Sequence, residues 1–273
     1  MGFDGRVAPA VVSLLTCTTL LAVLTSACMA REGPDSASAS APSADLIVQR
    51  MMAANARRSQ GLRAFTGKRS YRVDYHGFLG GREADMQVLA SFTAPDKKDF
   101  KIVSESGSKL LINHVFLKLL DSEKEYLEES TRQASELSPR NYEFTYLGQD
   151  HTSDGDFYIL RVSPRERSEF LYKGKIWVDM HDYAVARIQG EPAKNPSVWI
   201  GHTEIDHHYQ KVGDFWLPAR NESVTQVRLG GKAVLTIDYS DYKITAVNQV
   251  SPGPVPGNEP VLPNPSTVTA DPH

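Results

Sequence analysis

Cysteine is scarce in this chain, and the two that it has do not suggest a disulfide. Cys17 lies inside an apolar N-terminal run, and Cys28 lies just behind that run. If the run is removed as an export signal, Cys28 is the single cysteine left, and no disulfide can form within the chain. An exported domain of roughly 200 residues without disulfides must be held by its own hydrophobic core, which a chain of that length can bury.

The short motifs of common enzymes are also lacking. The chain has no Gly-x-Ser-x-Gly, no His-Glu-x-x-His and no glycine-rich phosphate loop. An excess of charge of one sign is missing too, because 30 lysines and arginines are interspersed with 33 aspartates and glutamates, which argues against nucleic acid as a partner. These absences favour a binding protein with no catalysis, no cofactor and no resident metal. A hydrolase whose acids and histidines converge only in space is the alternative.

Residues 1–27 have the architecture of an export signal. Arg6 supplies positive charge, and an uncharged apolar run from Val11 to Ala27 follows. This run is short for a transmembrane helix, which needs about 20 predominantly apolar residues. We therefore expect an exported protein and read no fold into this segment.

The small residues before Cys28 resemble a bacterial lipobox, in which the cysteine becomes an acylated N-terminus. The match departs from the usual motif at Thr25, where leucine is common. We expect a lipid anchor on Cys28 and a protein that faces the periplasm; Met29, which is not the aspartate retention signal of enteric bacteria, favours the outer membrane. Two alternatives stay open: cleavage after Ala27 or Ala30 to release a soluble periplasmic protein, and an uncleaved anchor.

Composition divides the rest of the chain into three parts. Residues 28–44 are rich in serine, alanine and proline and predict a flexible, lipid-anchored linker. Residues 45–247 carry nearly all the periodic apolar pattern and predict the folded domain. Residues 248–273 are rich in proline and predict a disordered tail, either a spacer or a contact for a protein partner.

Two segments of the folded part predict helices. Residues 45–60 place Leu46, Ile47, Met51 and Ala54 on one stripe, with Asp45 as a candidate N-cap and Gly61 as a stop. Residues 108–120 form a long apolar run that we interpret as a buried helix leading into a charged loop at 121–138. A strand is the alternative for this run, because periodicity alone does not separate the two.

The remaining pattern alternates with a period of two, which is typical of half-buried antiparallel strands. It predicts about ten strands, and a sheet of that size usually curls. The fold class is thus mainly β with two helices: a curled antiparallel sheet, or incomplete β-barrel, around a helix lid and an apolar cavity. The expected strands lie near 71–75, 84–92, 100–102, 142–147, 156–162, 175–179, 184–189, 198–212, 215–229 and 232–244.

Three stretches resemble the LolA/LolB/RseB superfamily of envelope proteins: Gly174–Asp179, Tyr183–Pro192 and Tyr209–Pro218. The resemblance covers about residues 45–245 and implies an incomplete barrel with helices as a lid over a cavity for acyl chains. It further implies a role in sorting lipoproteins or lipids to the outer membrane, with the acyl chains of lipoproteins or phospholipids as partners. An RseB-like sensor that binds a protein is the alternative. The superfamily's arginine on an early strand matches either Arg69 or Arg72.

Candidate cavity residues are apolar or aromatic and fall on the expected inner faces of the elements, although ordinary core packing explains the same pattern. They are Met51, Tyr71, Val73, Met86, Val88, Leu111, Val115, Leu119, Trp177, Trp199, Trp216, Leu235 and Ile237.

One strand also aligns His202, Glu204, Asp206 and His208 on a single face. Such residues can bind a divalent metal, but spacing by two along a twisted strand offers few convergent ligands. We interpret this set as the wet outer face of the sheet and expect no metal.

Overall fold

The computed structural model describes residues 42–77, 80–125, 129–168, 170–195, 200–228 and 230–248. The expected signal peptide, the lipid anchor, the tail beyond residue 248 and Trp199 lie outside these residues. Among the described residues, no helix has both the length and the apolar character that crossing a membrane requires.

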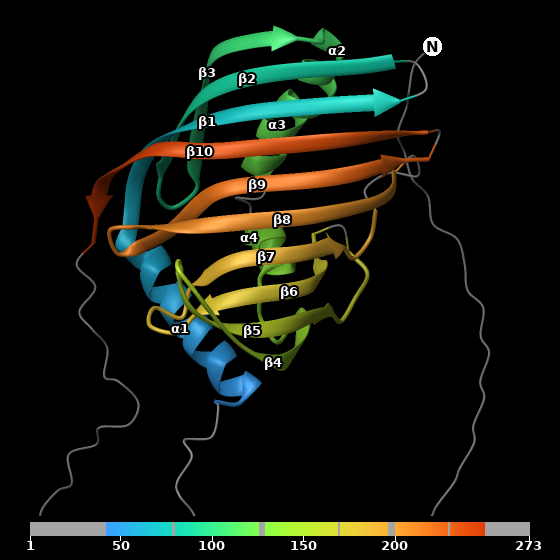
Figure 1. Cartoon of the computed structure of the whole chain (residues 1–273). Helices are drawn as coiled ribbons and strands as arrows, with labels where there is room; N and C mark the ends of the chain where they lie inside the picture. Colours follow the sequence, from blue (N-terminus) through green and yellow to red (C-terminus); the bar gives the residue numbers. More distant parts are fainter. Residues whose placement is uncertain are drawn as a thin grey trace, which may run out of the picture. The chain divides into compact units, whose positions relative to one another are not determined.

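The ten expected strands are present and form one antiparallel sheet, which is open and curled (Figure 1). Its strand order is β3-β2-β1-β10-β9-β8-β7-β6-β5-β4, so β3 and β4 are the two edges. The strands are β1 (Leu62–Gly77), β2 (Gly80–Thr93), β3 (Lys97–Gly107), β4 (Tyr142–Thr152), β5 (Gly155–Pro164), β6 (Tyr172–Asp179), β7 (Val185–Pro192), β8 (Ile200–Val212), β9 (Phe215–Val227) and β10 (Gly231–Val247).

The pairing of the first strand with the last joins two meanders into one sheet. Tyr71 of β1 lies opposite Met86 of β2 on one side and opposite Ile237 of β10 on the other. All three side chains are buried on the same face. Because a strand alternates its side chains between two faces, this register fixes which residues of β1 and β10 point inward.

Helix α1 (Ala44–Gly61) agrees with the expected helix, with two corrections at its start. The N-cap is Ser43, whose side chain accepts a hydrogen bond from the Leu46 amide, and not Asp45. Asp45 instead lies in the first turn, where a carboxylate favours the positive end of the helix dipole. Leu46 is 36% exposed and is not part of the buried stripe, which Ile47, Val48, Met51 and Ala54 form.

The apolar run at 108–120 is helical, as expected, and the strand alternative is wrong. It consists of α2 (Lys109–Leu111), a π-helical turn η1 (Ile112–Phe116) and α3 (Leu117–Glu125), which follow one another without a break. We call this stretch the 109–125 segment. The expected charged loop at 121–138 is also partly helical, because α3 runs to Glu125 and α4 (Glu129–Ser135) follows.

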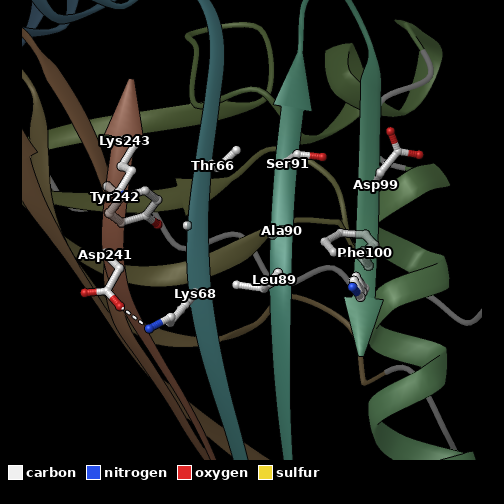
Figure 2. A pocket seen from close by; sticks show the side chains of 12 residues that line it. Thr66, Lys68, Leu89, Ala90, Ser91, Asp99, Phe100, Asp241, Tyr242 and Lys243 are labelled. Atoms are coloured by element: carbon white, nitrogen blue, oxygen red, sulfur yellow. Dashed lines mark ion pairs between the residues drawn. The ribbon is translucent and has the colours of Figure 1, made fainter. Parts of the chain in front are cut away.

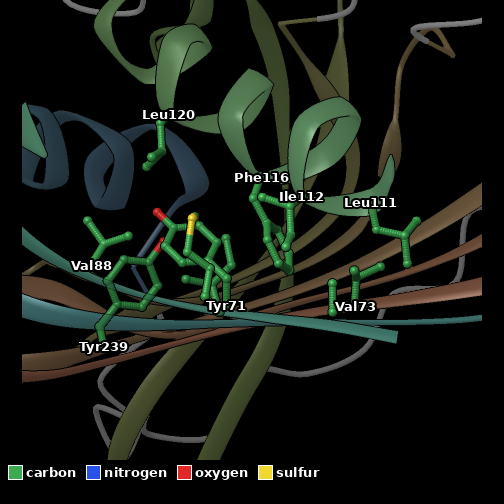
Figure 3. Packing of buried hydrophobic residues seen from close by; sticks show 11 residues of the cluster. Tyr71, Val73, Val88, Leu111, Ile112, Phe116, Leu120 and Tyr239 are labelled. Atoms are coloured by element: carbon green, nitrogen blue, oxygen red, sulfur yellow. The ribbon is translucent and has the colours of Figure 1, made fainter. Parts of the chain in front are cut away.

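Buried apolar side chains form two separate clusters on the inner face of the sheet, the face that carries the helices. Cluster 1 joins β1, β2 and β10 to the 109–125 segment (Figure 3): Tyr71, Val73, Ala84, Met86, Val88, Leu111, Ile112, Phe116, Leu120, Ile237 and Tyr239. Cluster 2 joins α1 to β4–β7: Ile47, Val48, Met51, Tyr142, Leu160, Val162, Leu171, Ile176, Val178 and Ile188. The two halves of the sheet are therefore covered by different helices.

Candidate functional site

The 109–125 segment covers cluster 1 almost entirely through apolar contacts. Phe116 is fully buried, and its ring centroid lies 5.7 Å from that of Tyr71. Leu111, Ile112 and Leu120 face the sheet from the same segment (Figure 3). Apolar packing is not directional. The sheet surface under the segment would therefore accept other apolar groups if the segment moved away.

Charged contacts tie this segment to the sheet at two places: the exposed Lys109 pairs with Glu105 on β3, and Glu123 on α3 meets two basic residues. The Nη1 atom of Arg69 on β1 lies 2.5 Å from Oε1 of Glu123 on α3, and it donates a second hydrogen bond to the Tyr71 hydroxyl at 3.2 Å. Lys98 on β3 reaches the other oxygen of Glu123 at 3.3 Å. We call Arg69, Glu123 and Lys98 the latch.

The Arg69 guanidinium sits among aromatic rings and is almost inaccessible to water. Its central carbon lies 5.1 Å from the ring centroids of both Phe100 and Tyr239, and the residue is 8% exposed. Burial by itself would lower the pKa of Arg69, but the Glu123 carboxylate and the Tyr71 hydroxyl outweigh burial and raise it. The arginine is therefore charged at every physiological pH, and its charge depends on Glu123 for compensation.

The structure separates the two arginines that the sequence left undecided. Arg69 shares the inner face with Tyr71, whereas Arg72 lies on the outer face among Asp74, Glu83 and Asp85 at 3.0 to 3.3 Å. The Arg72 side chain is 52% exposed. Exposed ion pairs contribute about 0–1 kcal/mol each. Because Arg72 points to the outer face, only Arg69 is placed to influence the inner face.

Polar contacts also tie helix α1 to the sheet. Arg58 donates hydrogen bonds to the carbonyl oxygens of Asp182 and Tyr183, at 2.8 and 3.2 Å, in the turn between β6 and β7. Arg50 donates to the Tyr183 hydroxyl at 2.7 Å. These polar anchors add to the contacts of cluster 2 and hold α1 against the inner face.

A hollow of about 470 Å³ opens beside the C-terminal half of α1, and we call it the α1 hollow. Ligand pockets usually measure about 300–1,000 Å³ and are mostly apolar. Apolar and aromatic side chains line much of this hollow, together with the polar Asn55 and Arg58. Its lining consists of Asn55, Arg58, Ser59, Leu62, Ser135, Leu137, Tyr172, Ala184, Val185, Ile188, Tyr209, Phe215 and Trp216.

The structure brings nine of the candidate cavity residues together. Tyr71, Val73, Met86, Val88, Leu111 and Ile237 belong to cluster 1, and Val115, Leu119 and Leu235 pack against it. The other described candidates lie elsewhere. Met51 is in cluster 2, and Trp216 lines the α1 hollow.

Trp177 is on the outer face and lines neither cluster nor the α1 hollow. Its neighbours Ile176 and Val178 point inward, so the alternation of β6 turns Trp177 outward. Its indole nitrogen donates to Asp150 at 3.0 Å, and Arg187 stacks over its ring at 4.8 Å. Outward aromatic residues on a strand carry the same sequence signal as inward ones when their neighbours are also apolar.

The four outer-face residues of β8, which are His202, Glu204, Asp206 and His208, pair with neighbouring charges or with one another. The Asp206 carboxylate accepts a hydrogen bond from Nε of Arg187 at 2.8 Å and contacts His208 at 3.1 Å. Burial would raise the pKa of Asp206, but Arg187 and His208 outweigh burial and lower it. His202 contacts Glu191 at 3.1 Å. Within the described part of the chain, no group of three potential metal ligands comes together.

A larger hollow of about 670 Å³ lies over β10, β1, β2 and β3 (Figure 2). Lys68, Lys101 and Lys243 line it together with Asp99 and Asp241, and Lys68 pairs with Asp241 at 2.7 Å. Most of these side chains alternate with buried residues and therefore belong to the outer face. This hollow is charged and faces away from the two clusters.

Sequence reasoning missed Glu123, the inward His207 of β8 and the inward polar residues of β9, although it placed Thr203, Ile205 and Tyr209 inward. Glu123 lay in a stretch interpreted as a charged loop, where one carboxylate cannot be distinguished from its neighbours. The inward residues of β8 are Thr203, Ile205, His207 and Tyr209, and the alternation of this strand already indicated the set.

Several solved structures are similar to the chain. A domain of Vibrio parahaemolyticus, described as outer membrane lipoprotein-sorting, is 12% identical with a TM-score of 0.36, over 73% of this chain and 92% of that one. A LolA superfamily protein of Nitrosomonas europaea is 15% identical with a TM-score of 0.35, over 76% of this chain and 96% of that protein. A chain of the MucA/MucB complex of Pseudomonas aeruginosa is 8% identical with a TM-score of 0.24, over 74% of this chain and 99% of that one.

One of these structures bears the name of the LolA superfamily, which three stretches of the sequence resemble. No protein-family model matches the chain, and no curated protein matches it in sequence. At identities of 15% and below and TM-scores below 0.5, positions of two chains cannot be paired one by one. The roles of the site residues therefore rest on this chain's own geometry.

Proposed function

We propose that the chain is a cell-envelope lipoprotein that binds acyl chains on the inner face of its curled sheet, with the 109–125 segment as a lid. The observation that carries the proposal is the covering of cluster 1 by a helical segment that one partly buried latch holds in place. The chain would handle lipoproteins or other lipids on their way to the outer membrane. Binding and release need no chemistry.

Acyl chains suit this face energetically. Burying a lipid chain is worth about 0.8 kcal/mol per CH₂ group. When the lid moves away from the sheet, the apolar side chains of the lid and those of β1, β2 and β10 become exposed. A bound acyl chain would cover both apolar surfaces again. A carrier also has to release its cargo, and a latch that closes on the empty protein would assist release.

The α1 hollow supports the proposal in a second way. It lies next to cluster 2, whose side chains are apolar, and Ile188 belongs to both. A chain end could enter it without displacing α1. Cluster 1, by contrast, is filled by the lid, so a ligand that reaches it must first open the lid.

Anchoring through Cys28 and the division into a signal (1–27), a linker (28–44), a domain (45–247) and a tail (248–273) are parts of the same proposal. The described elements run from Ala44 to Val247. The names of the similar structures, which include lipoprotein sorting, are consistent with a location in the envelope.

The filled cluster 1 also favours a second candidate, an RseB-like module that binds a protein partner and no lipid. In that case the lid segment is permanent core. The two candidates differ in one measurable property, which is whether the protein takes up free lipid.

Native mass spectrometry tests the proposal directly. We would use the exported chain with Cys28→Ser, which removes the expected covalent acyl group and leaves the described residues unchanged. Extra mass equal to a phospholipid or fatty acid, lost on delipidation and regained on mixing, is the expected result. A mass without lipid that does not change on mixing would overturn the proposal in favour of a protein-binding module.

A pair of adjacent leucines tests the lid. Leu111 is 8% exposed and belongs to cluster 1, whereas Leu110 is 52% exposed. We expect Leu111→Asp to weaken lipid retention while the sheet still folds, and Leu110→Asp to leave it unchanged. Equal retention in both variants would contradict the lid, with circular dichroism as the check on folding.

A further inference from the structure

The inner face changes character in the middle of the sheet. Five inward positions of β8 and β9 are polar and form what we call the polar row: Thr203, His207, Asn221, Ser223 and Thr225. Their inward direction follows from cross-strand pairing, because Thr203 lies opposite Thr225 and His207 opposite Asn221. Neither apolar cluster includes a residue of β9, every residue of which is described.

The polar row lies between the two apolar clusters. Next to it on β10, Ile237 of cluster 1 pairs with Asn221. On β8, Ile205 packs against cluster 2. A ligand that lies across the inner face from one cluster to the other must therefore pass over β8 and β9, as their central place in Figure 1 shows.

Contacts within the polar row leave hydrogen-bonding capacity unused. The hydroxyl groups of Thr203 and Thr225 lie 3.0 Å apart and share one hydrogen bond, so one of the two protons is free to be donated. Asn221 donates from Nδ2 to the Tyr239 hydroxyl at 3.1 Å, but its buried Oδ1 has no hydrogen-bond partner. A buried polar atom without a partner costs about 1–3 kcal/mol, and turning the amide over would only exchange one such atom for the other.

We propose that the polar row binds the ester linkage of a diacyl glycerolipid whose chains reach cluster 1 and the α1 side of the sheet. The free threonine proton can be donated to an ester carbonyl, and the Oδ1 atom of Asn221 accepts from a ligand hydroxyl. The polar row contains no lysine or arginine, and the nearby Arg69 is neutralised by Glu123. The row is thus suited to neutral carbonyls and hydroxyls and not to a phosphate.

This inference rests on the proposed function, because it assigns a place to the polar part of a lipid whose chains the apolar clusters bind. It adds a chemical preference that apolar surfaces cannot provide. The protein would bind two lipids with identical acyl chains with different affinities because of their linkage alone.

A matched pair of lipids tests the linkage. Dipalmitoylglycerol and dihexadecylglycerol each carry two sixteen-carbon chains and one hydroxyl group, but only the first has ester carbonyls. We would measure the binding of both to the exported Cys28→Ser chain by competition with a fluorescent fatty acid. A hydrogen bond of ordinary strength predicts roughly tenfold tighter binding of the ester lipid.

The double variant Thr203→Val, Thr225→Val removes both hydroxyl groups with little change of volume and leaves neither partner unpaired. It should abolish the tenfold preference while the ether lipid binds as before. Asn221→Leu should weaken both lipids equally, because both carry the hydroxyl. Thr236→Val is the control: Thr236 pairs with Arg72 on the outer face, and its loss should change nothing.

The outcomes separate this inference from the proposed function. Equal binding of ester and ether lipids, or a preference that survives in the double variant, would overturn the inference and leave acyl-chain binding intact. Failure of both lipids and of the fatty acid to bind would overturn the proposed function, and this inference with it. Thermal unfolding of each variant shows whether an altered affinity reflects altered folding.

Discussion

Removing Glu123 should destabilise the protein more than removing any exposed carboxylate, because it leaves the buried charge of Arg69 without compensation. Breaking a fully buried ion pair by deleting one partner costs about 3–5 kcal/mol. The Glu123 side chain is 26% exposed, so water can take part of its place, and the rings of Phe100 and Tyr239 remain around the guanidinium. We therefore expect Glu123→Leu to lower the free energy of unfolding by about 2 kcal/mol.

Urea unfolding followed by tryptophan fluorescence measures this loss. With a dependence on urea of about 2 kcal/mol per molar, the midpoint should fall by about 1 M. Hydrogen exchange should rise first in the amides of the 109–125 segment, since the latch joins this segment to β1 and β3. The amides of β6, at the far side of the sheet, should exchange as in the unmodified protein.

Two further variants make the argument refutable. Glu83→Leu removes a carboxylate from Arg72 on the outer face, where both side chains are exposed, and should cost less than about 0.5 kcal/mol. The double variant Arg69→Met, Glu123→Leu removes both charges and should regain most of the stability that Glu123→Leu loses. If Glu123→Leu costs no more than Glu83→Leu, or if the double variant is no more stable than Glu123→Leu, the reasoning about a buried, compensated charge is wrong.

Two other predictions concern the sheet. Gly174→Ala should destabilise the protein by roughly 2 kcal/mol or more, because a Cβ atom there would lie 2.1 Å from the carbonyl oxygen of Gln189 and force β6 and β7 apart. The urea midpoint should fall accordingly, and an unchanged midpoint would contradict the close approach of the strands. Burial lowers the pKa of His207 in the folded protein below the ordinary 6.5 that it has in the unfolded chain. At a pH between the folded and the unfolded pKa, the unfolded chain binds more protons than the folded one. Stability is therefore lost as the pH falls below about 6.5. His207→Gln should reduce that loss between pH 7.5 and pH 5.5, and an identical loss in both proteins would refute it.

The sequence predicted much of the fold because its signals are local. Alternation with a period of two gave the strands, and helical spacing gave α1. The long apolar run at 108–120 gave the covering helix, although the sequence did not show its π-helical turn or its extension to Glu125. Errors occurred where a local rule had two solutions. Asp45 and Ser43 are both good N-caps, and the chain geometry chose Ser43.

The candidate site was predictable only in part. The alternation of β1 already puts Arg69 on the face of Tyr71 and Arg72 on the face of Asp74, so the choice between the two arginines was present in the pattern. The partner of Arg69 was not, because Glu123 lies 54 positions away. Trp177 shows the opposite failure, since a large aromatic residue suggested a cavity and the register of β6 turned it outward.

By itself, the sequence determined the ten strands, the helices at α1 and at 108–120 and the apolar faces, since these depend on residues close together in the chain; the export signal stays a prediction. Tertiary structure alone decided that β1 pairs with β10, that one half of the sheet is covered by the 109–125 segment and the other by α1, and that a polar row separates them. These features arise from contacts between residues far apart in sequence. A hydrophobic pattern indicates that a face is buried, but it does not indicate which element covers that face.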